Sequence, residues 1–114
     1  MSRLDQINET LQKELALIIS KEAPLEGGMI TISKVDVTPD LKSAHIFFTV
    51  LPENLAGTAL KKLESNKGLF IRELKKRIKI KWIPDIYFKL DEGAIYANQV
   101  EAILGEIKRE KEDK

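Results

Sequence analysis

The chain of 114 residues lacks cysteine, which excludes disulfide bridges and thiolate metal centres. It has a single histidine, His45, and the acidic residues near it in sequence do not cluster at metal-ligand spacing. One histidine in a strand-like run is weak support for a serine–histidine–aspartate set. The pair Gly27-Gly28 matches neither P-loop nor dinucleotide-binding spacing. We therefore expect no metal, no cofactor and no catalytic site.

Long hydrophobic runs are also missing. The longest aliphatic run near the N-terminus, Leu15 to Ile19, is far shorter than the ~20 residues that span a bilayer. Residues 1–9 lack the apolar core of a signal peptide. Hydrophobic residues make up 43% of the chain and charged residues 32%, as in soluble globular proteins. We expect a soluble, cytoplasmic protein with a single domain over residues 1–108, a short charged tail over 109–114, and no membrane partner.

Positive charge is almost balanced overall but is concentrated in one part of the chain. The formal net charge is +1, from 19 basic and 18 acidic residues. Residues 54–84 contain nine of the basic residues and only two acids, so this segment carries +7. Residues 1–53 and 85–114 carry −3 each. Because the local field attracts phosphate more than the net charge does, residues 54–84 predict a surface that binds a polyanion.

The N-terminal half predicts one helix and a β-hairpin. Hydrophobic residues at three- and four-residue spacing predict an amphipathic helix over 3–21, with Ser2 and Asp5 forming a capping box. Alternating residues predict strands over 29–38 and 43–50, and the short connection favours an antiparallel hairpin. The phase of the alternation changes at Ser33-Lys34, which predicts a β-bulge.

The C-terminal part predicts a third strand and a last helix. Pro84 ends the basic helical segment, because the residue before a proline avoids helical angles. Alternation predicts a strand over 86–90, and hydrophobic spacing predicts a helix over 94–108. The element order is α-β-β-α-kink-α-β-α. Three strands with helices packed on one face make a two-layer α+β sandwich.

The segment Thr58 to Lys81 has helical periodicity, but Gly68 lies in the middle of it. Glycine inside a helix costs ~1 kcal/mol relative to alanine, and Asn66 is another poor helix former. These residues predict a kink or a break between two helices. A break leaves backbone N–H groups free at the start of the second helix, where the dipole is positive. A phosphate could therefore bind at the break, beside Lys67.

The residues after Gly68 separate by character when they are projected on a helix. The hydrophobic side chains share one arc: Phe70, Ile71, Leu74 and Ile78. The basic side chains share the opposite arc: Arg72, Lys75, Lys76 and Lys79, with Lys81 beyond them. Like charges four residues apart cost a few tenths of a kcal/mol each, so this arrangement favours an anionic partner.

Two simpler interpretations remain open for the same residues. A lysine-rich face near a helix C-terminus complements the helix dipole and keeps a protein soluble. Gly68 could be a C-capping glycine that ends one helix and does nothing else. A different kind of function is also possible, in which the outer face of the hairpin binds a protein. Phe47 is then the most exposed candidate aromatic of this outer face, and His45 a surface residue of the same face.

Taken together, these residues resemble the bacterial ribosome-binding factor A family over nearly the whole chain. The resemblance rests on Arg3 with its helix, on ITISKVDVTPDLKSAHIFFTV, on GLFIREL and on IPDIYFKLDEG. That family is similar to type II KH domains, whose GxxG loop clamps the RNA backbone. The family replaces this loop by a kink, usually a small residue, any residue and glycine. The matching triplet here is Asn66-Lys67-Gly68, with asparagine in place of the usual alanine or serine.

The resemblance implies a non-catalytic, monomeric factor that binds the free small (30S) ribosomal subunit and its 16S ribosomal RNA. It also implies a role in ribosome biogenesis, in late processing of that RNA, and in cold adaptation. The residues and the resemblance together predict an RNA-binding set: Arg3, Asn66, Lys67, Gly68, Arg72, Lys75, Lys76, Lys79 and Lys81.

Overall fold

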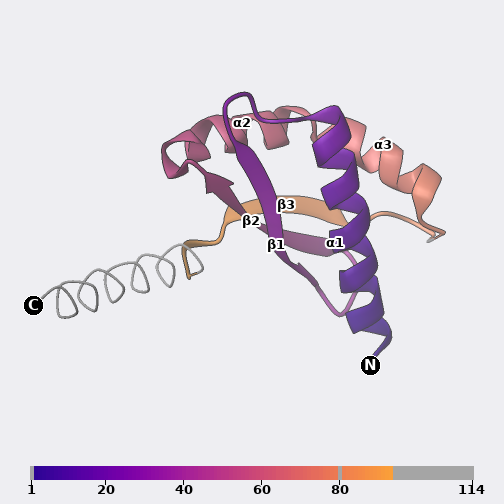
Figure 1. The fold of residues 1–114 in the computed structure, drawn as a ribbon. Helices are drawn as coiled ribbons and strands as arrows, with labels where there is room; N and C mark the ends of the chain where they lie inside the picture. Colours follow the sequence, from indigo (N-terminus) through magenta and orange to yellow (C-terminus); the bar gives the residue numbers. More distant parts are fainter. Residues whose placement is uncertain (1, 80, 94–114) are drawn as a thin grey trace, which may run out of the picture.

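The computed structural model describes residues 2–79 and 81–93. The elements follow in this order: α1 (Arg3–Glu22), β1 (Met29–Val37), β2 (Ser43–Leu51), a short 3-10 helix η1 (Glu53–Leu55), α2 (Ala56–Ser65), α3 (Lys67–Arg77) and β3 (Asp85–Leu90) (Figure 1). The order predicted up to residue 93 is therefore confirmed. The helix predicted over 94–108 and the tail over 109–114 lie outside the described residues.

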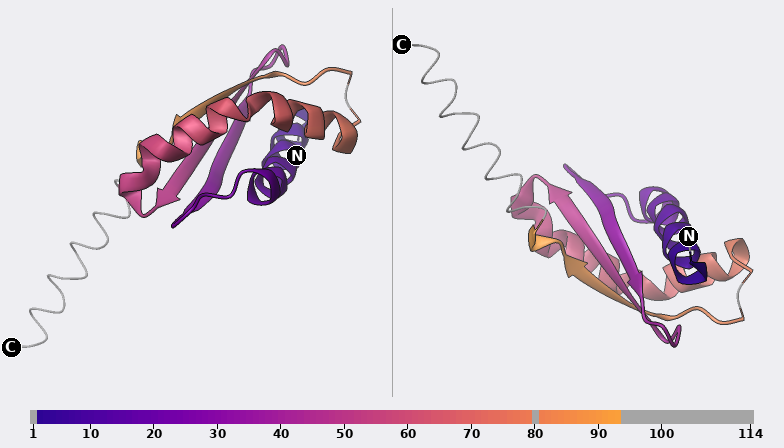
Figure 2. Two further views of the ribbon diagram at one scale, coloured as in Figure 1. Left: turned by 90° about the horizontal axis from the view of Figure 1, so that it is seen from above. Right: turned by 90° about the horizontal axis from the view of Figure 1, so that it is seen from below.

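The three strands form one sheet in the order β1-β2-β3. β1 and β2 pair antiparallel, with Met29 opposite Leu51, as the hairpin prediction requires. β3 lies parallel to β2, with Ser43 opposite Asp85. The helices cover one face of the sheet and leave the other face open (Figure 2). The result is a two-layer α+β sandwich, as predicted.

α1 begins with the predicted capping box. The backbone N–H of Asp5 donates to Ser2 Oγ at 3.1 Å, and the backbone N–H of Ser2 donates to Asp5 Oδ2 at 3.3 Å. The helix is attached to β1 by two polar side chains. Gln12 Nε2 donates to the carbonyl of Ile32 at 3.1 Å, and Asn8 Oδ1 accepts the N–H of Val37 at 2.9 Å. The register of β1 shifts between these two contacts, between Ile32 and Lys34, which confirms the predicted bulge.

The core lies between the sheet and the helices and is built from aliphatic and aromatic side chains. Alternation along β2 buries every second residue, from Ala44 to Val50. Within residues 2–79 and 81–93 no polar or charged residue is buried. The largest fully buried side chains are Phe48, Phe70, Leu11, Leu15, Ile18, Ile46, Leu63 and Leu74. Phe70 meets Phe88 of β3 edge to face, with 6.0 Å between ring centroids, so α3 is held firmly on the sheet.

Candidate nucleic-acid interface

The break predicted near Gly68 occurs at Asn66, which ends α2 and precedes α3. The carbonyl of Lys62 accepts from the backbone N–H of Asn66 at 3.2 Å and from its Nδ2 at 2.8 Å. Ser65 Oγ donates to the same carbonyl at 3.1 Å. The polar side chains therefore complete the last turn of α2 and stop it. The prediction of a break is confirmed, and Asn66 produces it through its own side chain.

The first turn of α3 has an open backbone at Gly68. Its first helical bond runs from the N–H of Phe70 to the carbonyl of Asn66 at 3.0 Å, and the Asn66 side chain makes no cap to α3. The first amides of a helix have no acceptor inside that helix, and in α3 these amides belong to Lys67, Gly68 and Leu69. Gly68 is exposed, and a Cβ placed on it would have nothing within 4 Å. A ligand could therefore approach this backbone closely, as a phosphate at a helix N-terminus does.

Lys67 does not extend freely from the break. Its Nζ lies 3.0 Å from Glu64 Oε2 and 5.6 Å from the ring centroid of Tyr87. The carboxylate and the aromatic ring hold the ammonium against the edge of β3. Its role in RNA binding stays a prediction, and an incoming phosphate would have to compete with Glu64 for this ammonium.

The two faces of α3 match the predicted arcs as far as the helix extends. Phe70 and Leu74 are buried, and Ile71 is half-buried against the core. On the opposite face Arg72 and Lys75 are exposed, and within 2–79 and 81–93 neither forms an ion pair or a hydrogen bond through its side chain. These two cations can therefore contact an anion without breaking an existing pair.

The other two basic residues near the end of α3 already have carboxylate partners. Lys76 Nζ lies 3.2 Å from Glu73 Oε1, one turn earlier on the same helix. Arg77 Nη1 lies 3.4 Å from Glu14 Oε2 on α1, so this pair joins the two helices. Lys76 therefore offers less free charge than its neighbours, and Arg77 has a structural role.

The prediction that Lys79 and Lys81 continue the basic face of a helix is wrong. α3 ends at Arg77, and Ile78 is already extended, with φ −116° and ψ 130°. β-branched residues weaken the end of a helix, and the chain must extend to enter β3 at Asp85. Ile78 still packs against the core, as its position on the hydrophobic arc predicted. Lys79 and Lys81 therefore belong to the connection between α3 and β3.

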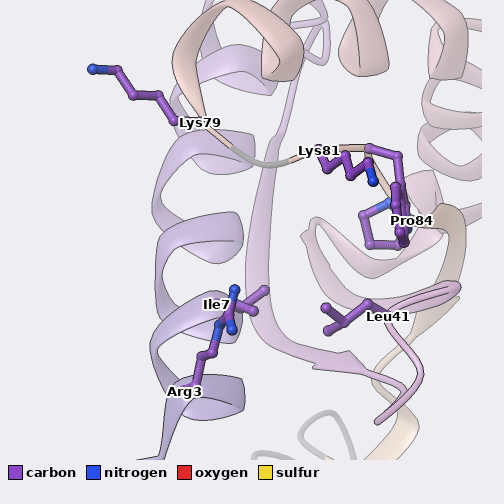
Figure 3. A pocket seen from close by; sticks show the side chains of 7 residues that line it. Arg3, Ile7, Leu41, Lys79, Lys81 and Pro84 are labelled. Atoms are coloured by element: carbon purple, nitrogen blue, oxygen red, sulfur yellow. The ribbon is translucent and has the colours of Figure 1, made fainter.

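Lys79 and Lys81, which lie on this connection, line the same cavity as Arg3. All three line a cavity of about 300 Å³, together with Ile7, Leu41, Trp82 and Pro84. In Figure 3 Arg3 extends along Ile7, Lys81 extends toward Pro84, and Lys79 extends away from both. The sequence suggested Arg3 only as an isolated contact and missed Trp82 and Leu41. The signal was a tryptophan directly after a lysine, in the segment richest in positive charge.

A turn between β1 and β2 forms one wall of this cavity. Thr38 Oγ1 donates to Asp40 Oδ1 at 2.6 Å, and the backbone N–H of Lys42 donates to the same oxygen at 3.1 Å. The hydrogen bond from Thr38, then that from Lys42, lowers the pKa of Asp40. Leu41 has φ 62°, a left-handed conformation that non-glycine residues rarely adopt. The Asp40 contacts hold the turn in which this conformation occurs.

The outer face of the sheet carries the second candidate surface. Tyr87 is 45% exposed and stacks on His45, with 5.7 Å between ring centroids. His45 and Phe47 are both half-buried, and Lys34 Nζ lies 5.8 Å from the Phe47 ring centroid. Phe47 is the more exposed of the two aromatic residues of the hairpin, as expected, because Phe48 is fully buried. His45 does lie on the outer face, and its Nδ1 has no hydrogen-bond partner among the described residues.

The order of the elements and the pairing of the strands together define the class of fold to which this protein belongs. Two antiparallel strands, a broken helix and a third strand parallel to the second make a type II KH-like α+β domain. Among residues 2–79 and 81–93, no three metal-ligating side chains gather. No helix in the same ranges is long and apolar enough to cross a membrane.

Comparison with known proteins identifies the family within this class. The family model described as Ribosome-binding factor A matches residues 3–104. Ribosome-binding factor A of Macrococcus caseolyticus is 34% identical, covering 96% of this chain and 97% of the relative. That of Brevibacillus brevis is 35% identical, covering 97% of this chain and 93% of the relative. The chain belongs to the ribosome-binding factor A family.

Solved structures agree on the fold. The crystal structure of ribosome-binding factor A from Thermus thermophilus matches with a TM-score of 0.66 and 18% identity, covering 76% of this chain and 93% of that chain. A homology model of the Thermus thermophilus factor, fitted into an electron cryo-microscopy map of a complex with the 30S subunit, matches with a TM-score of 0.58 and 19% identity. It covers 72% of this chain and 88% of that chain.

Proposed function

We propose that this protein is a small-subunit assembly factor that binds the 30S subunit and its 16S ribosomal RNA. The single observation that carries the proposal is the start of α3. There the amides of the first turn, the open backbone at Gly68 and the exposed Arg72 and Lys75 share one helix. Family membership supports the choice of partner, since a homology model of the Thermus thermophilus factor was fitted into a map of its complex with the 30S subunit.

The physical basis of binding is the neutralisation of RNA phosphates. Arg72 and Lys75 would contact phosphates and position the protein, while the shape of the RNA supplies most of the selectivity. The amides at the break would bind a further phosphate, with Gly68 allowing its close approach. Each neutralised phosphate releases counterions, so the affinity should fall as salt rises.

The factor acts without catalysis in this proposal. A protein that binds an immature subunit more tightly than a mature one shifts the folding of the RNA by that difference in affinity. This effect would assist late processing of the ribosomal RNA. It would matter most in the cold, where misfolded RNA rearranges slowly. We propose that the protein acts as a cytoplasmic monomer.

Charge reversal on α3 tests the proposal. The variant Arg72→Glu/Lys75→Glu changes two exposed side chains that have no ion pairs in the described part of the chain. We expect it to keep its circular dichroism spectrum and to stop co-sedimenting with free 30S subunits. The remaining affinity should also depend less on salt, with a log–log slope smaller by about 2.

A matched control separates this face from the other candidate surface. Lys34→Glu/Lys89→Glu makes the same change in net charge on the open face of the sheet, where both lysines are exposed. We expect this control to co-sediment as the unmodified protein does. If the control loses the subunit and the α3 variant retains it, the protein binds through the sheet. The exposed Tyr87 would then be the centre of a protein-binding surface.

A further inference from the structure

The cavity beside Arg3 lies apart from the first turn of α3, and the proposed function gives it no role. It opens between the start of α1, the β1–β2 turn and the connection that enters β3. We propose that it takes a single unpaired nucleotide of the RNA, with the base on Trp82 and the flanking phosphates near Arg3 and Lys81. This inference rests on the proposed function and names the part of the RNA that the site reads.

The charges around the cavity select an anionic ligand. Arg3, Lys79 and Lys81 line it, and no acidic residue among those that the structure describes does so. A second cavity of about 230 Å³ continues along α1 to Ile78 at the end of α3, and it shares Arg3 and Ile7 with the first. Its described lining also contains no acid. An RNA strand bound on α3 can therefore continue to Arg3 without passing a carboxylate of either lining.

The apolar residues that line the cavity favour a flat, partly apolar group. Ile7, Leu41 and Pro84 provide an apolar surface, which a phosphate alone would not use. The volume of about 300 Å³ is at the lower limit of small-ligand pockets, so it suits one nucleotide rather than a longer segment. A free phosphate therefore fits the cations, and a nucleotide fits both the cations and the apolar surface.

Trp82 provides the surface on which a base can stack. It is 54% exposed, and Lys81 Nζ lies 5.5 Å from its ring centroid. An exposed indole next to a cation is the combination that binds unpaired bases, because the ring stacks on the base and the cation meets the phosphate. An RNA duplex keeps its bases stacked inside, so it cannot offer a base to this ring.

The emission of Trp82 can be measured without a label, because the chain has a single tryptophan. The full-length protein is titrated at low salt with single-stranded hexaadenylate, with linear hexaphosphate, with a blunt 12-base-pair RNA duplex and with hexaglutamate. We expect hexaadenylate to quench the emission and the other three to leave it nearly unchanged. Equal quenching by hexaphosphate would reduce the site to a phosphate site and overturn the inference. Equal quenching by hexaglutamate would assign the cavity to an acidic protein segment, and no quenching by hexaadenylate would show that no base enters.

Variants of Trp82 measure what its indole ring contributes to the affinity for hexaadenylate. Binding of labelled hexaadenylate is followed by fluorescence anisotropy for Trp82→Ala, Trp82→Phe and the control Tyr87→Ala, an exposed aromatic on the open face of the sheet. We expect Trp82→Ala to weaken binding about 5- to 100-fold, the usual effect of removing one stacking ring. Trp82→Phe should recover most of the affinity, and Tyr87→Ala should stay within about twofold of the unmodified protein. If Trp82→Ala binds as tightly as Tyr87→Ala does, the inference is wrong.

The variant Arg72→Glu/Lys75→Glu separates this inference from the proposed function. It should bind hexaadenylate more weakly but still reach the full quenching of Trp82 at saturation, because the cavity is intact. Its loss of 30S binding tests the proposed function alone. A normal 30S interaction of this variant, with quenching still specific for hexaadenylate, would overturn the function assigned to α3 and leave the nucleotide site standing.

Discussion

Replacing Gly68 by alanine should move stability and binding in opposite directions. Gly68 lies in the first turn of α3 and is exposed, and a Cβ added there would have no neighbour within 4 Å. Its backbone φ is not in the left-handed region, so alanine is not strained there. Alanine also loses less conformational entropy on folding than glycine, which should stabilise the protein by about 0.4–1 kcal/mol. The midpoint of thermal unfolding should rise by about 2–5 °C.

The same methyl group would stand where the phosphate approaches the amides of α3. If it removes one charge-assisted hydrogen bond, worth about 1.5–3 kcal/mol, the affinity for 30S subunits should fall about 10- to 100-fold. Stability is measured by urea unfolding followed by circular dichroism, and affinity by sedimentation with purified 30S subunits. A protein that is more stable and binds less tightly cannot have lost binding by unfolding.

Gly28→Ala serves as the matched control. A Cβ at Gly28 would lie 2.5 Å from the carbonyl oxygen of Leu51, so the backbone must shift. We expect this variant to lose about 1–3 kcal/mol of stability and to bind 30S subunits normally once folded. Two results would refute the reasoning for Gly68: a loss of stability in Gly68→Ala, or 30S binding equal to that of the unmodified protein.

Three further predictions concern α3 and the turn beside the cavity. Leu74 is fully buried, so Leu74→Ala should cost about 2–5 kcal/mol in the free energy of unfolding, measured with urea. The pair of Arg77 and Glu14 is partly exposed at 3.4 Å, so a double-mutant cycle with Arg77→Gln and Glu14→Gln should give a coupling below about 1 kcal/mol that shrinks at high salt. The pKa of Asp40 should lie below that of an unfolded aspartate in an NMR titration, and Thr38→Val should raise it. Because the folded pKa is the lower one, the contribution of Asp40 to stability is complete above the unfolded pKa and is lost as pH falls through the folded pKa.

Hydrophobic spacing was enough to predict most of the fold up to residue 93. The stripe of α1, the alternation of β2 and the change of phase at Ser33 each reflect one local rule, and each is found in the structure. Local rules could not give the parallel pairing of β3 with β2, which depends on residues far apart in the chain. That pairing was not predicted from the sequence.

The candidate site was predicted only in part, because some of its features belong to one helix and others depend on the rest of the fold. The break and the two arcs of α3 are properties of one helix, so Asn66, Arg72 and Lys75 could be placed from sequence. The end of α3 depends on where the chain must turn to reach β3, and helical periodicity continued past it to Lys79. The contact of Lys67 with Tyr87 and the cavity beside Arg3 depend on tertiary contacts, which the sequence alone did not reveal.

The parallel pairing of β2 and β3 also has a consequence for how the chain folds. A chain that leaves β2 at Leu51 must return along the sheet before it can enter β3 at Asp85. As one helix, Ala56 to Arg77 would be about 33 Å long, close to the ~30 Å length of a nine-residue strand such as β2. The helix pair therefore serves as the return path of the crossover (Figure 1).

Closing this crossover is the slow, non-local step in the folding of the chain. Ser43 pairs with Asp85, 42 positions further along the chain, whereas Val37 pairs with Ala44 only seven positions away. Because long loops cost more entropy to close, the hairpin should form first and β3 should join last. The residues assigned to RNA lie mostly on the late-closing segment. RNA that binds only the closed form would therefore favour completion of the fold, and binding and the last step of folding would be thermodynamically linked.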